Sequence, residues 1–423
     1  MSASSQAPTV LVIGAGMYVC GRGTNSYGTV LPTLVQAQRA GTIGEIVVAA
    51  TSQDSVTSLR NKLDQLNQRW GTRVTVRSYP KERANDPFAY RDALTELPRP
   101  ACAIVVVPDH LHARITAEVI RAGMHVLLVK PLTPTVVEAQ QLIELARAHQ
   151  VYGAVDFHKR FDEANLLLRQ MLTEGRLGEL RHIRVAFSQR RQIRETFRSW
   201  IHTTNIFQYL GVHYVDLIYF LTGARPVRVL ATGQPRAAIR KGLWHLDAIQ
   251  AVIEWEERAS GQTFASTILT SWIDPERTSA MSDQQLIAVG TRGRYESDQK
   301  RRGVQLVTDE AGVEEPNPYF SQLYQGPTGE PVIEGYGPRS IQQFLSDVHA
   351  LLERRCRVPD LQKTRPSFQE AFLSTAVVDA VNRSLMKGET WVTIDEMEED
   401  AVVKPRRVLT APRPRQRTAA VRR

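Results

Sequence analysis

The 423-residue sequence predicts a two-domain α/β protein, in which a doubly wound parallel sheet precedes an α+β domain with a large, open, mostly antiparallel sheet. In the first part of the chain, apolar strand-like runs alternate with helical periods, which is typical of a parallel sheet. From residue 180 onward, strand-like segments with short turns dominate, which is typical of antiparallel pairing. The length supports two domains, because single cores stop growing beyond roughly 250–300 residues.

Each predicted element of the first domain follows from its residue pattern. Residues 9–13 (TVLVI) are a continuous β-branched apolar run, as expected for a strand buried on both faces. The same reasoning predicts five further strands, over 45–50, 73–78, 101–107, 125–129 and 152–156. Helical spacing of apolar residues predicts helices over 31–40, 55–70, 113–122 and 136–148. In a sheet of this kind, ligands bind at the carboxyl ends of the strands.

A glycine turn, Gly14-Ala15-Gly16, follows the first predicted strand at once. Glycine permits a tight turn there and lets the backbone approach a pyrophosphate, whose charge then lies at the N-terminus of the next helix. A third glycine is usual at position 19, where this chain has valine, so we expect a longer phosphate loop or helix entry. The order of strand, glycine turn and helix predicts a Rossmann-type domain over 1–155 that binds NAD or NADP.

The predicted crevice gathers residues from four strand ends. The expected contacts to the cofactor include Gly14, Gly16, Met17, Ser52, Pro108, Asp109 and Lys130. An acidic residue at the end of the second strand normally bonds the adenosine ribose and repels a 2′-phosphate. Here residues 50–53 are ATSQ and the first acid is Asp54, so Ser52 with Arg22 or Arg60 is available to a 2′-phosphate. The sequence leaves the choice between NAD and NADP open.

The second domain is predicted over 156–395. Its expected strands cover 180–188, 227–232, 248–256, 264–273, 285–289 and 293–298, with a short turn at 290–292. One face of this sheet is expected to pack on helices, including one over 207–222, and the other face to stay apolar or mixed. Residues 299–335 are expected to form an insertion or long loop that closes over the substrate or reaches a neighbouring subunit. Helices are predicted over 341–352 and 368–385.

The composition excludes several classes of protein. Hydrophobic residues make up 42% of the chain and charged residues 23%, as in ordinary globular proteins. No apolar run reaches the roughly 18 residues of a membrane span, and the N-terminus does not resemble a secretory signal. Cys20, Cys102 and Cys356 are scattered and have no metal-ligand spacing. We therefore expect reduced thiols, no metal site and a cytoplasmic protein.

Most of the formal net charge of +9 lies at the C-terminus. Residues 404–423 hold eight basic residues and no acid, which leaves +1 for the rest of the chain. With its prolines and few apolar residues, the segment 396–423 is predicted to be a disordered basic tail. A solvated tail is favoured over a tail that binds an anionic surface, so neither nucleic acid nor a membrane is an expected partner.

Three segments resemble the Gfo/Idh/MocA oxidoreductases, named for glucose-fructose oxidoreductase and inositol dehydrogenase. They are VVVPDHLHARITAEVIRAGMHVLLVKPL (105–132), FHKRFDEANLLLRQMLTEGRLGELRHI (157–183) and GVHYVDLIYFLTGARPVRV (211–229). The resemblance implies an NAD(P)-dependent dehydrogenase that acts on a secondary hydroxyl of a sugar, glycoside or sugar derivative. The family analogy favours C3 of a glucosyl unit. It also implies a homo-oligomer, a dimer or tetramer, formed through the second sheet.

Position by position, the resemblance implies roles for residues of the crevice. Lys130 is the lysine that contacts the substrate hydroxyl and the nicotinamide ribose, and His213 is the histidine in acid/base contact with that hydroxyl. Three positions depart from the family pattern: Asp109 replaces an asparagine, Val129 a glutamate, and Tyr209 the carboxylate four residues before the histidine. The third departure leaves His213 without its usual partner.

The chemistry of these groups suits alcohol oxidation, which needs hydride transfer and a base for the hydroxyl proton. Burial and a neighbouring nicotinamide cation are expected to lower the pKa of Lys130 towards neutrality. Tyr209, His213 and Asp216 have the i, i+4, i+7 spacing of one helix face. We expect Asp216 to orient His213, and Tyr209 to offer its hydroxyl to the substrate. A half-buried histidine without a catalytic role is the competing interpretation of His213.

Further polar residues complete the candidate site. His112 is expected to hold the cofactor-binding loop, and His158 is expected to contact the nicotinamide or the substrate. Trp200, Thr204 and Asn205 precede the histidine helix, where ring and amide groups suit the apolar face and the hydroxyls of a sugar.

The competing function is a non-catalytic, dinucleotide-binding regulator on the same fold. Tyr209 in place of the carboxylate favours the regulator, whereas Lys130-Pro131 and His213 count against it. The fold also permits an enzyme that retains its cofactor and alternates between two substrates.

Overall fold

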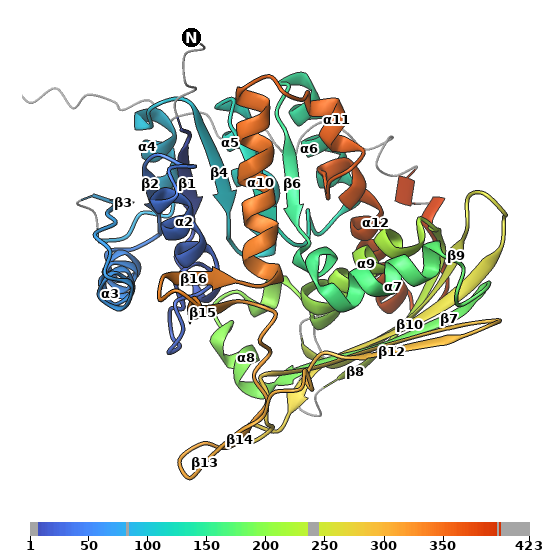
Figure 1. Ribbon diagram of the computed structural model, residues 1–423. Coiled ribbons are helices and arrows are strands. Elements are labelled where there is room, and N and C mark those ends of the chain that lie inside the picture. The colour runs from blue at the N-terminus through green and yellow to red at the C-terminus, as the bar shows by residue number, and fades with distance from the viewer. Residues whose placement is uncertain (1–6, 82–83, 236–244, 396, 399–423) are drawn as a thin grey trace, which may run out of the picture.

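The computed structural model describes residues 7–81, 84–235, 245–395 and 397–398. Its first sheet has six parallel strands in the order β3-β2-β1-β4-β5-β6 (Figure 1). They are β1 (Thr9–Ile13), β2 (Ile46–Ala49), β3 (Val76–Tyr79), β4 (Ala101–Val105), β5 (His125–Val129) and β6 (Gly153–Asp156). All six predicted strands are therefore confirmed. The strand order reverses between β1 and β4, which is where such sheets bind ligands.

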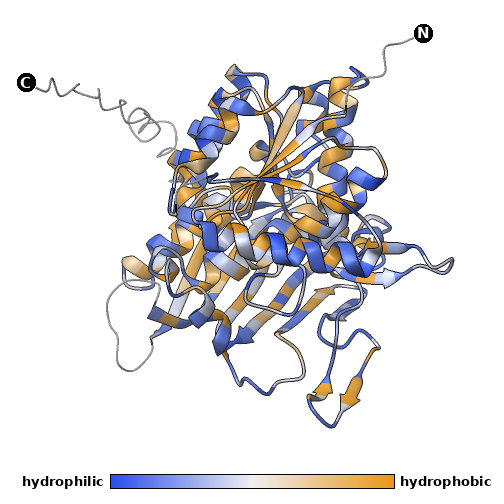
Figure 2. Ribbon diagram, turned by 90° about the vertical axis from the view of Figure 1, so that its left-hand side faces the viewer, coloured by the Kyte–Doolittle hydropathy of each residue, from blue (hydrophilic) through white to orange (hydrophobic). Residues whose placement is uncertain are grey.

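Both faces of this sheet are covered by helices. They are α2 (Val30–Arg39), α3 (Gln53–Trp70), α4 (Ala89–Glu96), α5 (His112–Arg121) and α6 (Val136–Ala148). Successive strand residues point to opposite faces, so Leu11 and Ile13 of β1 pack in the core with α5 and α6. Val10 and Val12 pack in the core with α2 and α3. Burial on both sides explains the apolar run of β1, and the central strands of this sheet are largely in the hydrophobic colour in Figure 2.

The expected longer segment after the glycine turn is confirmed. A single helical turn, α1 (Met17–Cys20), ends at Gly21, which has a left-handed backbone with φ 72°. The chain then forms a loop before α2 begins. Gly28 closes this loop against α1: a Cβ at this position would lie 2.7 Å from backbone atoms of Val19 and Cys20. The loop therefore stays close to the carboxyl ends of β1 and β2.

The second sheet has seven strands in the order β12-β11-β7-β10-β9-β8-β17. They are β7 (Leu180–Arg190), β8 (Arg225–Pro235), β9 (Leu246–Glu256), β10 (Thr263–Asp274), β11 (Ser282–Gly290), β12 (Arg294–Asp298) and β17 (Val392–Thr393). Neighbouring strands are antiparallel except β7 and β10, which are parallel. The prediction of a mostly antiparallel sheet is confirmed. Strand β17 was not predicted, because two residues have no readable period.

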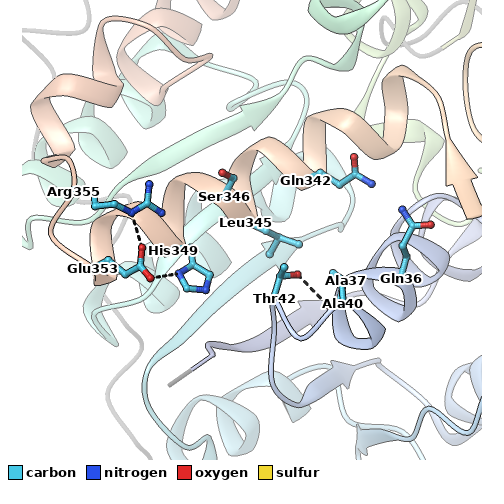
Figure 3. A pocket seen from close by; sticks show the side chains of 10 residues that line it. All are labelled: Gln36, Ala37, Ala40, Thr42, Gln342, Leu345, Ser346, His349, Glu353 and Arg355. Atoms are coloured by element: carbon cyan, nitrogen blue, oxygen red, sulfur yellow. Dashed lines mark hydrogen bonds and ion pairs between the residues drawn. The ribbon is translucent and has the colours of Figure 1, made fainter. Parts of the chain in front are cut away.

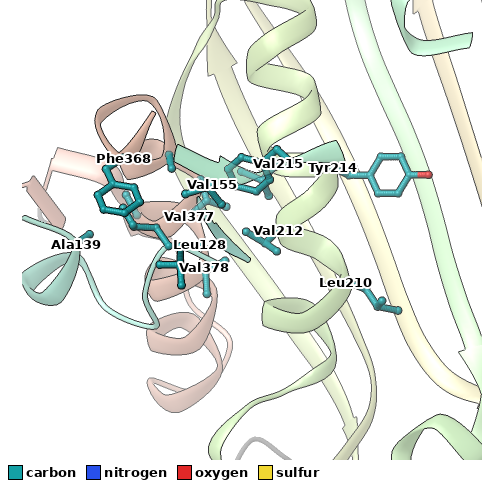
Figure 4. Packing of buried hydrophobic residues seen from close by; sticks show 14 of the residues in the cluster. Leu128, Ala139, Val155, Leu210, Val212, Tyr214, Val215, Phe368, Val377 and Val378 are labelled. Atoms are coloured by element: carbon teal, nitrogen blue, oxygen red, sulfur yellow. The ribbon is translucent and has the colours of Figure 1, made fainter. Parts of the chain in front are cut away.

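Helices from distant parts of the chain fill the space between the two sheets (Figure 1). They are α7 (Glu163–Thr173), α9 (Val212–Thr222) and α12 (Phe368–Met386). Val212 of α9 and Val377 of α12 belong to one hydrophobic cluster with Leu128 of β5 and Val155 of β6 (Figure 4). The same cluster includes Trp255 of the second sheet. Helix α9 is thereby held between both sheets.

Residues 299–335 form two hairpins rather than one irregular loop. They are β13 (Leu306–Thr308) with β14 (Gly312–Glu314), and β15 (Gln322–Gln325) with β16 (Pro331–Glu334). The first hairpin projects beyond the second sheet (Figure 1). The second is fastened to α2, because the Gln36 side chain accepts from the backbone N–H of Ile333 and donates to its carbonyl. Strands this short have no clear period, so the sequence pattern did not indicate them.

Helix α10 (Tyr336–Leu352) follows these hairpins and returns to the first sheet. Its apolar residues Ile341, Phe344 and Val348 belong to the core that Val10 and Val12 of β1 also share. The helix falls within the predicted second domain, 156–395, although it packs on the first sheet. The predicted division at residues 155 and 156 stays a prediction.

The outer face of the second sheet is mixed in character, as expected. Leu269 and Ile273 of β10 are 42% and 47% exposed, and Gln250 lies across from Leu269 on β9. Assembly of several copies through this face stays a prediction. Within the described ranges, no helix combines the length and apolar character needed to cross a membrane. The predicted basic tail over 396–423 lies outside the described residues, apart from Met397 and Glu398.

Gly153 of β6 tests the packing of α12 on the first sheet. A Cβ at this position would lie 2.5 Å from the buried ring of Phe368. We expect Gly153→Ala to lower the free energy of unfolding by about 1–3 kcal/mol, the usual cost of overpacking a core, as measured by urea denaturation. In a Phe368→Leu background the loss should be smaller, because the ring is gone. An equal loss in both backgrounds would show that the ring contact is not the cause.

Candidate active site

The glycine turn lies between β1 and β4, where the strand order of the first sheet reverses. Gly14 has φ 122°, and a Cβ there would lie 2.0 Å from the carbonyl oxygen of Val106. Only glycine fits both this backbone conformation and this space. Gly16 is exposed, and a Cβ on it would meet nothing within 4 Å. The open space above the turn fits the close approach of a dinucleotide pyrophosphate.

Two other predicted cofactor contacts lie at the same edge of the sheet. Met17 and Pro108 follow β1 and β4, and both are half-buried. They flank the glycine turn because the carboxyl ends of neighbouring parallel strands meet at one edge.

Lys130 follows β5 and contacts the turn that precedes α9. Its Nζ donates a 2.6 Å hydrogen bond to the carbonyl oxygen of Tyr209 and lies 3.9 Å from the centre of the Tyr209 ring. Burial lowers the pKa of Lys130 to about 8, while the charges of Asp109 and Asp156 oppose this shift. The direction is the one expected from the sequence. An amine with this pKa exchanges protons readily near neutral pH, as acid/base chemistry requires.

Asp109 joins the end of β4 to the segment that precedes α9. Its buried Oδ2 accepts hydrogen bonds from Thr204 Oγ1 (2.8 Å) and Gln208 Nε2 (2.7 Å). Thr204 was expected to contact the substrate, but its buried hydroxyl is used by Asp109. Asn205 needs the same correction: it is buried, donates to Asn382 Oδ1 (2.8 Å) and accepts from the Gln208 N–H (3.0 Å). These residues position the site rather than line it.

His213 lies on α9, just after a π-helical turn over Phe207–Gly211. Such turns are rare and frequently occur at functional sites. The predicted regular helix over 207–222 is therefore irregular between Tyr209 and His213. His213 is 5% exposed, and its Nδ1 has no hydrogen-bond partner among the described residues. Burial lowers its pKa well below the usual range, and nearby positive charges add to this effect, so the ring is a neutral proton acceptor.

Asp216 pairs with Arg160 and not, as predicted, with His213. Its two carboxylate oxygens accept from the guanidinium at 2.8 and 2.6 Å, and both side chains are buried. A buried carboxylate needs such a partner, because an isolated charge is costly to bury. The pair fastens α9 to the 3₁₀ turn η2 (His158–Phe161). Asp216 thus supports the helix and leaves His213 without a carboxylate from its own helix.

Tyr209 presents the face of its ring, and not its hydroxyl, to Lys130. The Tyr209 ring also packs against Phe197 in a T-shaped arrangement, with 5.0 Å between ring centres. Burial, and to a lesser degree the charge of Asp109, raises the pKa of Tyr209 well above its usual range. The phenol therefore stays protonated and is not a base. Its expected role as a hydroxyl donor to the substrate stays a prediction.

His158 brings together aromatic side chains from four segments. Its ring lies 4.8 Å from His213, 5.4 Å from Phe320, 5.7 Å from Tyr336 and 6.3 Å from Tyr18, measured between ring centres. Three of these neighbours were not predicted. Tyr18 follows the glycine turn, whereas Phe320 precedes β15 and Tyr336 begins α10. Closure of the segment 299–335 over the substrate was one of the two expectations for it, and Phe320 of this segment lies beside His158.

His112 holds two loops together and is not available to a cofactor. It is fully buried, with Nδ1 2.7 Å from the Pro131 carbonyl oxygen and Nε2 2.9 Å from that of Val107. The expected role of His112 in holding the cofactor-binding loop agrees with this geometry. Trp200 is half-buried and stacks near Phe197 at 4.7 Å. Its contact with substrate stays a prediction.

A second buried lysine was not singled out from the sequence. Lys159 donates hydrogen bonds to Gln284 and Gln299 and lies 4.9 Å from the centre of the Tyr214 ring. Burial lowers its pKa to about 7. Lys159 therefore adds a positive charge next to His158 at acidic pH and loses much of it above neutrality.

The adenosine end of the crevice is built by the start of α3 and the loop after α1. Ser52 caps α3 by accepting a hydrogen bond from the N–H of Ser55 (3.2 Å). Arg22 donates to the Ser55 hydroxyl at 2.5 Å. Arg60 instead donates to the Ser78 hydroxyl of β3 at 2.9 Å. Of the two arginines, Arg22 is therefore the one whose guanidinium lies beside Ser52 and Ser55.

A cavity of about 390 Å³ lies elsewhere, between α2 and the later turns of α10 (Figure 3). His349 and Glu353 line it and lie 3.5 Å apart. The cavity shares no lining residue with the cluster around Lys130 and His213, so it is not part of the candidate site.

Two family models match the chain. The model for an oxidoreductase family with an NAD-binding Rossmann fold matches residues 9–157, and that for the GFO/IDH/MocA C-terminal domain matches residues 166–296. Together they cover both sheets up to β12.

Individual relatives match parts of the chain. The uncharacterized oxidoreductase YdgJ of Escherichia coli is 29% identical over 238 residues, which are 56% of this chain and 62% of YdgJ. The scyllo-inositol 2-dehydrogenase (NADP(+)) IolW of Bacillus subtilis is 29% identical over 134 residues, 31% of this chain and 37% of IolW. The matched region is thus under two thirds of either relative. A scyllo-inositol dehydrogenase from Lactobacillus casei, solved with NAD(H) and scyllo-inositol, is 15% identical, with a TM-score of 0.61 over 92% of this chain and 99% of that one. That likeness shows a shared fold.

Asp109→Asn tests the electrostatics at Lys130. Loss of the Asp109 charge is expected to lower the pKa of Lys130 below about 8, because that charge opposes the effect of burial. Reductive ¹³C-methylation and an NMR titration of the lysine signals measure this, with Lys130→Arg to assign the signal. Asp92→Asn, at an exposed carboxylate, is the matched control. A Lys130 midpoint that stays unchanged or rises would contradict this account.

Proposed function

Because the chain belongs to the Gfo/Idh/MocA family of NAD(P)-binding oxidoreductases, we propose that it is a dehydrogenase that oxidises a secondary ring hydroxyl of a sugar or cyclic polyol. The observation that carries this proposal is the hydrogen bond from Lys130, whose pKa is lowered to about 8, to the turn just before His213, a neutral imidazole whose pKa the Lys130 charge helps to lower. The names of IolW and of the Lactobacillus casei enzyme, both scyllo-inositol dehydrogenases, support a cyclic polyol or sugar. The C3 hydroxyl of a glucosyl unit belongs among the first substrates to test.

The residues divide the chemistry of such an oxidation between them. A bound nicotinamide supplies the hydride acceptor. His213 takes the hydroxyl proton, since its ring is neutral. The protonated Lys130 amine donates one of its three N–H groups to the Tyr209 carbonyl. Its other two N–H groups can bind the substrate oxygen and stabilise the negative charge that develops there. In the reverse direction, His213 returns the proton to the oxygen.

The aromatic cluster gives the site a wall suited to a ring. His158, Phe320 and Tyr336 lie side by side, and their rings present apolar surface next to His213. A sugar or inositol ring has an apolar face of axial hydrogens that packs well on such surfaces. The wall also limits the access of water to the reacting carbon.

A non-catalytic regulator is the second candidate function. The observation that favours it is Tyr209, because its raised pKa prevents the phenol from replacing the carboxylate as a base. A regulator of this kind would bind the dinucleotide and a sugar without turnover. The two functions are separated by the variants described next.

Lys130→Met and His213→Asn test the proposed chemistry. With NAD and NADP supplied separately, the wild-type protein should raise the absorbance of reduced nicotinamide with one class in a panel of inositols, sugars and glycosides. Each variant should lower kcat by about 10²–10⁴-fold, the usual contribution of an acid/base group, while the cofactor Kd changes little. Lys363→Met, at an exposed lysine, is the control. Cofactor binding without turnover on any member of the panel would favour the regulator.

The adenosine end favours NADP over NAD. Residues 50–53 contain no acid that would repel a 2′-phosphate, and the Arg22 guanidinium lies beside the Ser52 and Ser55 hydroxyls at the start of α3. A guanidinium and hydroxyl groups at a helix N-terminus suit a phosphate.

Arg22→Gln tests this preference by binding alone. The affinity of the variant for NADP should fall about 10–100-fold, because a charge-assisted hydrogen bond to the phosphate is removed. Its affinity for NAD should change by no more than about twofold. Isothermal titration with each dinucleotide measures both values. Arg60→Gln is the matched control, since Arg60 is bonded to Ser78. A wild-type protein that binds NAD more tightly than NADP would overturn the preference and leave the proposed reaction intact.

A further inference from the structure

The amine of Lys130 forms no salt bridge with a carboxylate among the described residues. Burial disfavours its charged form, and Asp109 and Asp156 oppose this effect only through their charges. Asp109 Oδ2 accepts two hydrogen bonds from the segment before α9, and the oxygens of Asp156 accept from the hydroxyls of Tyr18 (2.6 Å) and Ser340 (2.7 Å). An ammonium group in these surroundings needs other contacts that favour its charge.

Two close contacts of this amine come from one residue, Tyr209. The Nζ of Lys130 donates a 2.6 Å hydrogen bond to the Tyr209 carbonyl oxygen and lies 3.9 Å from the centre of the Tyr209 ring. The face of an aromatic ring carries partial negative charge and attracts an ammonium group within about 6 Å of its centre. Because the raised pKa of Tyr209 keeps the phenol neutral, this attraction comes from the ring face and not from a phenolate.

The orientation of the Tyr209 ring is fixed by its other neighbours. The Tyr209 N–H donates to the Asn205 carbonyl oxygen at 2.9 Å, and Asn205 is itself buried. The ring packs in a T-shaped arrangement against the buried Phe197 ring, which packs in turn on Trp200 at 4.7 Å. A ring held through both its backbone and its side chain keeps its face toward Lys130 in the protein without substrate.

We infer that Tyr209 is a positioning residue for Lys130 and that it acts through the face of its ring: the ring and the main-chain carbonyl hold the protonated amine in place and leave its remaining N–H groups for the substrate oxygen. In this account Lys130 does not need the phenol hydroxyl. The use of those N–H groups rests on the proposed function. The contact between ring and amine is a property of the protein without substrate.

An aromatic ring and a carboxylate have different consequences at position 209. A carboxylate in contact with the amine would raise the pKa of Lys130 strongly and would add a negative charge to the site. A ring face attracts the ammonium more weakly and adds no charge. The amine is therefore held in place and still loses its proton near pH 8.

The charged and titratable groups around Lys130 come from several elements. Asp109 follows β4 and Asp156 ends β6, and the charges of both favour the ammonium. His112 at the start of α5 and His213 on α9 are influenced by the Lys130 charge, and burial lowers the pKa of both, so each ring is neutral near pH 7. Substitutions at position 209 leave all four groups in the chain, so a shift of the Lys130 midpoint reports the change of the ring.

The test is an NMR titration of the full-length protein without cofactor or substrate, labelled with ¹³C at the Cε of its lysines. Lys130→Arg assigns the Lys130 signal. Tyr209→Leu removes the ring and keeps an apolar side chain, so the Lys130 midpoint should fall by about half a pH unit or more. Tyr209→Phe keeps the ring and removes the hydroxyl, so the midpoint should stay close to that of the wild type.

A fluorinated series separates the charge of the ring face from the shape of the ring. Phenylalanine with one, two or three ring fluorines, inserted at position 209 by amber suppression, has an electron-poorer face and nearly the same size. The Lys130 midpoint should fall stepwise from Tyr209→Phe to the most fluorinated side chain. The Lys159 signal, assigned with Lys159→Arg, is the internal control and should not move, because its ring neighbours are Tyr214 and Phe187.

Three outcomes would overturn the inference. An unchanged or raised Lys130 midpoint in Tyr209→Leu would show that the ring does not favour the ammonium. An equal shift in Tyr209→Phe and Tyr209→Leu would assign the effect to the hydroxyl, and a flat fluorinated series would assign it to the filling of space. Circular dichroism checks the folding of every variant, and the fluorinated series decides the question if Tyr209→Leu does not fold.

None of these results depends on turnover, so failure here is distinct from failure of the proposed function. Once a substrate is oxidised, the alkaline limb of kcat/KM should lie at lower pH in Tyr209→Leu than in Tyr209→Phe, because an amine with a lower pKa loses its proton at lower pH. A purely structural role of Tyr209 would lower kcat without moving that limb.

Discussion

The buried carboxylate of Asp109 is the contact on which the geometry of the site depends, because it joins the first sheet to the segment that carries His213. Thr204 and Gln208 both donate to it, and the second of these donors lies within the π-helical turn. Lys130, from the neighbouring strand end, donates to the carbonyl of Tyr209 in that same turn. Two adjacent strands of the first sheet thus hold the irregular turn that precedes α9. One side of the crevice is therefore held by hydrogen bonds between strand ends of the first sheet and the segment before α9.

The architecture could be predicted where burial imposes a regular pattern on the residues. Strand β1 at residues 9–13 and helix α6 at residues 136–148 have the predicted bounds, because one is buried on both faces and the other has a helical stripe of apolar residues. The segment 299–335 could not be predicted in this way. Its strands have three or four residues, and its contacts with α2 and with His158 involve partners that are distant in the sequence.

The sequence indicated which strand end carries Lys130 and which helix carries His213, but not the partners of the polar residues around them; the acid/base roles stay a prediction. Lys130 and His213 stand in recognisable motifs at the end of a strand and on a helix. The partners of Asp216 and Thr204 lie 56 and 95 residues away, and only the folded chain brings them together. The expected face shared by Tyr209, His213 and Asp216 assumed a regular helix, which the π-helical turn interrupts.

The first sheet is covered on one face by helix α10, which is synthesised long after the strands of that sheet. It covers one face of that sheet through Ile341, Phe344 and Val348, although about 180 residues separate its start from the end of β6. A ribosome adds roughly 5–20 residues per second, so α10 is synthesised some 10–40 seconds after β6, and this face of the sheet lacks α10 during that time. The nascent nucleotide-binding half therefore offers apolar surface to chaperones before it can close. Chains that terminate early would be released with this surface exposed and cleared as unfolded protein.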